Sequence, residues 1–174
     1  MSAHDAASRP VLRPWQVPWL LSPSGSFLSI SHTEEIWECR VETNVILGPL
    51  AGGQDDTSNG SQRIRVDFDG GLWSRISPTS SESEPLGHLK LDWSEVPFRG
   101  PVADVGARIR EYEERWLQTR LCPDPGAYEV HGSSWAGESG AARLGLRHFL
   151  LVGTEAYAEV LAKGWRWSFT ASDG

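Results

Sequence analysis

The sequence predicts an α+β fold in which a mainly antiparallel, curved β-sheet forms a meander or partial barrel, with one long amphipathic helix packed against it. Several segments alternate apolar and polar residues, as strands with one buried face do. The 18 glycines and 11 prolines lie mostly between apolar runs, where they favour turns. One clear stretch after residue 100 has its apolar residues at helical spacing. A chain of 174 residues, 39% of them hydrophobic, has the size of one domain with its own core.

The N-terminal segment lacks any sustained apolar pattern. Residues 1–12 are therefore predicted to be a flexible tail, and residues 13–174 a single globular domain. Directly after the tail, the pairs Pro14-Trp15 and Pro18-Trp19 favour extended backbone whose indoles dock onto the domain.

The clearest strand pattern lies in segment 36–47. Trp37, Cys39 and Val41 share one face there, and charged residues share the other. Gly70 and Gly71 predict a tight turn that makes 72–76 the hairpin partner of the segment before it. The other strand candidates are 27–31, 63–69, 88–93, 144–152 and 165–169. The residues expected to form the core are Trp37, Val41, Ile64, Val66, Phe68, Leu89, Leu91, Leu150 and Val152.

The long helix is predicted between Pro101 and Pro123. Proline is favoured in the first turn of a helix and cannot continue a helix past its end, so these two residues limit its extent. An apolar stripe with steps of three and four residues runs between them, formed by Val102, Val105, Ile109, Tyr112 and Trp116. The stripe is too short for a coiled coil, so we expect it to be buried against the sheet.

Segment 154–163 permits two predictions. Thr154, Lys163 and Gly164 fit the N-cap, the last turn and the end of a short helix. The alternation around Tyr157 and Leu161 fits a strand that returns on segment 144–152 instead. The sequence alone leaves both open.

The formal net charge of −7 argues against several classes of partner. Non-specific nucleic-acid binding depends on clustered Lys and Arg, and this chain has no basic stripe. The same lack disfavours an anionic membrane surface. No window approaches the roughly 18 consecutive apolar residues of a transmembrane helix. We therefore expect neither nucleic acid nor membrane among its partners.

Cys39 and Cys122 are the only cysteines of the chain, and neither lies in a cluster with the spacing of a zinc site. The first residues lack the apolar region of a secretion signal. Glycine motifs for dinucleotides or phosphates are also absent. The sequence therefore predicts a cytoplasmic protein with two free thiols, no cofactor and no metal.

Nine tryptophans in a chain of this length are its most unusual feature. Each indole buries a large apolar area and needs a partner for its N–H, so such residues serve a core, an aromatic cleft or an interface. Trp15, Trp19 and Trp135 lie outside the alternating runs and have no assigned core face. We expect these three to form an exposed binding patch.

The best candidates for acid/base chemistry are His148 and His131. Leu146 and Leu150 face the same way as His148 on a predicted strand, which places this imidazole in an apolar setting. The run His131-Gly-Ser133-Ser134-Trp135 holds a possible serine nucleophile near a histidine, but adjacency is poor evidence, because triads assemble from distant segments.

A pair of carboxylates is a weaker candidate. Asp67 and Asp69 project from one face of a predicted strand, about 7 Å apart, which is within the range of paired carboxylates in glycosidases. Arg63 and Arg65 share this face, so a charge-balanced outer surface is expected.

Two hypotheses of function follow. The first is a non-catalytic cytoplasmic interaction or regulatory domain that binds a protein partner through a Trp-bearing surface. The second is a small-ligand-binding protein or enzyme with an aromatic-lined pocket, in which a histidine moves protons. Because catalytic motifs are absent, the first is favoured, and a protein is expected as partner before a small molecule. A cavity that contains a histidine or carboxylate would favour the second.

Overall fold

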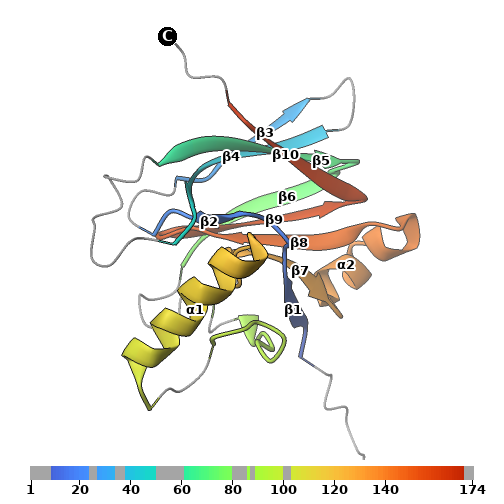
Figure 1. Cartoon of the computed structure of the whole chain (residues 1–174). Coiled ribbons are helices and arrows are strands. Elements are labelled where there is room, and N and C mark those ends of the chain that lie inside the picture. Colours follow the sequence, from blue (N-terminus) through green and yellow to red (C-terminus); the bar gives the residue numbers. More distant parts are fainter. Residues whose placement is uncertain are drawn as a thin grey trace, which may run out of the picture.

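The chain folds into two antiparallel sheets that curl together into a half-barrel, so the predicted α+β fold with a curved sheet is confirmed (Figure 1). This computed structural model describes residues 9–23, 27–33, 38–49, 61–79, 86, 89–99 and 103–170. The first sheet has the order β1 (Val11–Pro14), β7 (Ala127–His131), β8 (Arg147–Val152), β9 (Ala156–Ala162) and β6 (Trp73–Pro78). The second has the order β10 (Gly164–Phe169), β5 (Gln62–Asp69), β4 (Glu38–Leu47) and β2 (Trp19–Leu21), and β3 (Ser29–Thr33) also pairs with β4. The helices are α1 (Val105–Thr119), α2 (Ser134–Glu138) and a 3-10 helix at Ala141–Leu144.

The main core lies between the two sheets. Strand β4 alternates as predicted, with Cys39, Val41 and Val45 buried, while Trp37 lies outside the described residues. Ile64, Val66 and Phe68 of β5 are buried beside them, as predicted. The facing layer comes from alternate residues of β8 and β9, which are Phe149, Leu151, Ala158, Val160 and Ala162. Each strand therefore contributes every second residue to this core.

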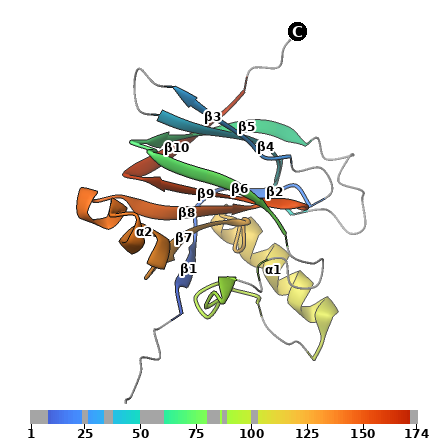
Figure 2. The same cartoon turned by 180° about the vertical axis from the view of Figure 1, so that it is seen from behind.

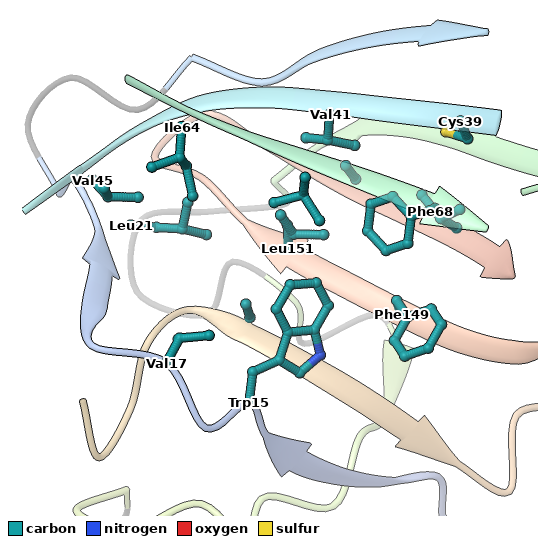
Figure 3. Packing of buried hydrophobic residues seen from close by; sticks show 14 of the residues in the cluster. Trp15, Val17, Leu21, Cys39, Val41, Val45, Ile64, Phe68, Phe149 and Leu151 are labelled. Atoms are coloured by element: carbon teal, nitrogen blue, oxygen red, sulfur yellow. The ribbon is translucent and has the colours of Figure 1, made fainter. Parts of the chain in front are cut away.

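Trp15 and Trp19 are in this core, so the prediction that they form an exposed patch is wrong for both (Figure 3). The ring of Trp15 stacks on Trp165 of β10 with centroids 3.9 Å apart, and its edge meets Phe149 of β8 at 5.9 Å. Trp19 is fully buried and meets Trp167 edge to face. The chain is extended near Pro14 and Pro18, as predicted. The side chains of this segment pack between the two sheets and not on the surface of the domain.

The predicted hairpin of 63–69 with 72–76 is wrong. Strand β6 pairs with β9 in the first sheet, with Arg75 opposite Glu159, whereas β5 belongs to the second sheet. Gly71 explains the change of sheet, because a Cβ atom there would lie 2.5 Å from the Cβ of Cys39. The glycine lets the chain pass close to β4 as it leaves one sheet for the other.

The outer face of the first sheet is also covered. Leu12, Tyr128 and Leu150 are buried there beneath the segment around residues 86–96, in a second apolar cluster that Leu89, Leu91 and Val152 join as partly buried residues. Residues 89–93 form no strand, contrary to prediction, and only Asp92 bridges to Val11. The alternation arises because every second side chain of this segment, Leu89, Leu91 and Trp93, packs on the apolar cluster of the first sheet.

Two boundaries also differ from expectation. Val11 and Leu12 belong to β1, so the tail prediction is wrong for them, because pairing with β7 and burial of Leu12 hold this backbone. Residues 1–8 lie outside the described residues. Segment 154–163 contains strand β9, which pairs with β8, so the strand alternative is the correct one.

We predict that Trp15→Ala lowers the free energy of unfolding by about 3–5 kcal/mol, because it removes a buried ring that contacts both sheets. Phe169→Ala is the matched control, since this ring is 49% exposed at the end of β10, and it should cost less than about 1 kcal/mol. Denaturant unfolding followed by fluorescence measures both. Equal losses in the two variants would contradict the placement of Trp15.

Candidate functional site

An open groove of about 770 Å³ lies between α1 and the ends of β2, β4 and β8. Its apolar lining consists of Leu20, Leu21, Pro23, Ile46, Pro49, Phe98, Ile109, Tyr112, Trp116 and Val152. Charged side chains occur at Arg99, Arg108, Glu113 and Asp124. Mostly apolar and aromatic walls with a few polar groups are typical of sites that bind apolar ligands or segments.

Helix α1 forms one wall of the groove, and local contacts fix its position. Its N-cap is Asp104, whose carboxylate accepts a hydrogen bond from the backbone N–H of Ala107 at 2.9 Å. At the other end, Trp116 packs on Ile46, and its indole N–H donates to the Pro18 carbonyl at 3.3 Å. The helix is therefore attached to the sheets mainly through its C-terminal half.

The apolar stripe of α1 is only partly covered, which corrects the expectation that the whole stripe is buried. Trp116 is 3% exposed, whereas Ile109 is 52% and Val105 is 64% exposed. All three lie on one face at helical spacing, as predicted, and Val102 lies outside the described residues. The C-terminal end of the stripe packs on the protein, whereas its N-terminal end extends past this contact and borders the groove.

A closed polar network forms part of the groove wall. The Arg99 guanidinium donates to Asp124 at 2.7 Å and to the Tyr128 hydroxyl at 3.3 Å, and this hydroxyl also donates to Asp124. Arg99 stacks over the ring of Trp93 at 4.7 Å. Burial, together with the charge of Asp124, raises the pKa of Tyr128 well above its usual value. The network is rigid and neutral in sum, so it shapes the wall.

Tyr112 of the groove and the neighbouring Cys122 are not activated as nucleophiles. The Tyr112 hydroxyl lies 3.0 Å from the thiol of Cys122, and burial raises the pKa of both groups, that of Cys122 to about 12. Both therefore stay protonated at neutral pH. What this arrangement can do chemically is hold an apolar surface.

The two predicted histidines are on different faces of the first sheet. His148 lies on the outer face and is 6% exposed, and it pairs across the sheet with Val130. Since neighbouring residues of a strand point to opposite faces, His131 points away from it. His131 is half-exposed, and its ring contacts Glu129 at 3.4 Å. The structure does not bring the two together.

Trp135 and His148 lie in contact, although the sequence analysis proposed Trp135 for partner binding and His148 for acid/base chemistry. The edge of one ring meets the face of the other with centroids 5.1 Å apart. Trp135 is partly buried on α2, next to a small cavity of about 80 Å³ that His148 also lines. Of the three tryptophans predicted to bind a partner, only Trp135 reaches the surface.

The carboxylate pair proves to be part of a charge-balanced face. Asp67 is buried and accepts hydrogen bonds from Arg40 at 3.0 Å and from Arg65 at 3.1 Å, whereas Asp69 is exposed. In the described part of the chain, no group of three or more His, Cys, Asp or Glu side chains is placed to hold a metal ion. Among the described helices, none combines the length and apolar character that crossing a bilayer requires.

Sequence reasoning missed most of the groove. Phe98, Arg99 and Asp124 lie in irregular segments on either side of α1, where no periodic pattern marks a shared surface. The sequence predicted the apolar stripe of α1. The stripe is longer than the part of the helix that packs on the sheets, and no other feature of the sequence pointed to an open surface there.

We predict that both cysteines resist iodoacetamide in the folded protein at neutral pH. Burial raises the pKa of Cys39 to about 11 and that of Cys122 to about 12, and both thiols are free. Mass spectrometry should show slow alkylation in buffer and two fast alkylations in denaturant. A thiol that reacts equally fast in both conditions would contradict its burial.

A second prediction concerns α1. Ile109→Ala should change the free energy of unfolding by less than about 0.5 kcal/mol, because the side chain is half-exposed. Trp116→Ala should cost about 3–5 kcal/mol, because this ring attaches the helix. Denaturant titrations of both variants test the uneven burial of the stripe. A loss of several kcal/mol for Ile109→Ala would show that its end is covered.

Comparisons with known proteins assign no family. No family model, no curated protein and no solved structure matches this chain. Inferences of function therefore rest on the groove and on the outer face of the first sheet.

Proposed function

We propose that this protein is a binding domain that holds an apolar segment of a protein partner in the groove between α1 and the sheets. The observation that carries the proposal is the uncovered end of the α1 stripe. Ile109 lines the groove and Val105 continues its apolar surface, and both are more than half exposed on a helix whose other end is firmly packed.

Covering this surface would be favourable. A side chain such as Ile or Val gains about 1.5–3 kcal/mol when it passes from water to full burial. Contiguous apolar surface beside a concave site marks an interaction surface more often than scattered apolar residues do. Tyr112, which is partly buried and lines the groove, supplies an aromatic side chain at the packed end.

The extent of the surface favours a protein segment over a small molecule. With a rise of about 1.5 Å per residue, Val105 lies about 16 Å along the helix from Trp116. An amphipathic helix of a partner can follow such a strip, as in helix-in-groove recognition. Two polar segments of this chain, 51–60 and 80–85, contain one alanine as their only hydrophobic residue, so neither supplies a suitable apolar cover.

As expected from the sequence, the proposed function is binding of a protein partner. The proposed binding surface is the groove beside α1 and not a patch of exposed tryptophans. The exposed side chains of Val105 and Ile109 take the part assigned to Trp15 and Trp19, which are in the core. We also propose, as from the sequence, that the protein acts in the cytoplasm, and its two free, buried thiols are compatible with that location.

We predict that a photoactivated benzophenone side chain at position 109 links one protein to this chain in lysate of the source cells. Glu114 is the matched control position, because it lies on the opposite, exposed face of the same helix and should give no such product. Peptide mapping should place the linked residue in an amphipathic or apolar segment of the partner. Ile109→Asp should weaken binding of this segment as a synthetic peptide at least tenfold without loss of thermal stability.

Three outcomes would contradict the proposal. Linkage only to a second copy of this chain would indicate self-association. Linkage only to lipid or a metabolite would indicate a small-molecule site. Equal products from positions 109 and 114 would show that the groove gives no selectivity.

A further inference from the structure

Figure 2 shows α2 and α1 toward opposite ends of β8. A buried polar cluster lies at the α2 end, on the outer face of the first sheet. Glu159 of β9 is 1% exposed and accepts two hydrogen bonds from Arg75 of β6, at 2.5 and 3.0 Å. The Nε2 atom of His148 lies 3.1 Å from Glu159 Oε1. Its Nδ1 atom lies 2.8 Å from the hydroxyl of Ser133. The small cavity beside this cluster shares no lining residue with the groove.

The contacts indicate where the proton of His148 lies. Burial by itself would raise the pKa of Glu159, but the contact with His148 and the hydrogen bonds and charge of Arg75 lower it, so the carboxylate is ionised. An ionised carboxylate only accepts, so when His148 carries a single ring proton, its contact with Oε1 favours that proton on Nε2. Oε1 lies off the direction of this N–H, so the contact is electrostatic more than a well-aligned hydrogen bond. The lone pair of Nδ1 then faces Ser133.

Ser133 is oriented by two partners. As N-cap of α2, its Oγ accepts from the backbone N–H of Ala136 at 3.2 Å. Its own proton is then directed to His148 Nδ1. A hydroxyl, an imidazole and a buried carboxylate in series are the arrangement in which a base activates a nucleophile and a third group orients the base.

We propose that Ser133 and His148, with Glu159 as a positioning residue, form a hydrolytic site for esters of short acyl groups. This assigns His148 the acid/base role considered from the sequence, with a nucleophile that reaches it across α2 and β8. The site is independent of the proposed partner groove.

The reaction proceeds in two balanced steps. Ser133 Oγ forms a bond to the acyl carbon while its proton passes to His148 Nδ1, and the ester C–O bond breaks as the departing alcohol takes that proton. Water then attacks the acyl-serine and gives a proton to Nδ1, and the carboxylic acid leaves as this proton returns to Oγ. Glu159 stabilises the imidazolium formed in each step.

The cavity sets the substrate class. About 80 Å³ is the space of two or three water molecules at roughly 30 Å³ each, which suits an acyl group of a few heavy atoms. Leu91, Val130 and Leu150 give it apolar walls. Trp135 lies over the site, with the Arg75 guanidinium 4.2 Å from its ring centroid.

The test uses two small probes, methanesulfonyl fluoride and p-nitrophenyl acetate, on the full chain. We predict that the sulfonyl probe modifies Ser133 once per molecule, with loss of fluoride, and that this stops release of nitrophenol from the acetate ester. Ser168→Ala is the matched control, because Ser168 is an exposed serine of β10 that lines neither cavity, and it should retain both reactions. Ser133→Ala should lose both, and His148→Gln should slow them by about 10²–10⁴.

Thermal unfolding identifies variants that fold. Unmodified Ser133 in the folded wild-type protein, or equal rates in folded His148→Gln, would overturn the proposal and leave the cluster a structural cap and ion pair. Nitrogen-15 NMR of the His148 ring provides a second readout that needs no turnover. The wild-type protein should carry its proton on Nε2, and Glu159→Gln should weaken this preference. A proton on Nδ1 in the wild-type protein would also overturn the proposal.

Discussion

The packing of Trp15 between the sheets is the interaction on which the rest of the structure depends. Its indole follows β1 of the first sheet, stacks on Trp165 of the second and meets Phe149 and Phe68, whose rings also contact each other (Figure 3). One ring thus joins the first strand of the chain to the last. Aromatic contacts of this kind add to the free energy of apolar burial, so the curvature of the half-barrel and the aromatic core support each other.

Because the aromatic core occupies the space between the sheets, both candidate sites lie on the outside of this core. The first sheet is covered on its outer face, but the cover is uneven. At the end of β8, Val152 lines the groove, whose other wall is α1, attached through Trp116 to Ile46 of β4. At the other end, near His148, α2 and Trp135 close over a small polar cavity. A single strand therefore leads to both sites.

Two buried carboxylates show why one polar cluster is a candidate for chemistry and the other is not. Asp67 and Glu159 each accept hydrogen bonds from arginines, which offset the cost of burial. Around Asp67 the partners are cations alone, so its charge is simply neutralised. Glu159 also faces His148, which in turn faces a hydroxyl beside a cavity. The distinction depends on the neighbours, because a carboxylate by itself neither donates nor activates.

By itself the sequence determined the local structure: the α+β class, the alternating strands β4, β5 and β10, the strand face that His148 shares with Leu150 and the stripe of α1. These follow from the periodicity of side chains along one element, which neighbouring residues set. Only the tertiary structure decided that β6 pairs with β9, that Trp15 and Trp19 are core residues, and that Ser133, His148 and Glu159 meet. It also decided that, in the described part of the chain, Val105 and Ile109 are more than half exposed. Pairing between distant strands and the surface left open after packing depend on the whole chain, and no local period encodes them.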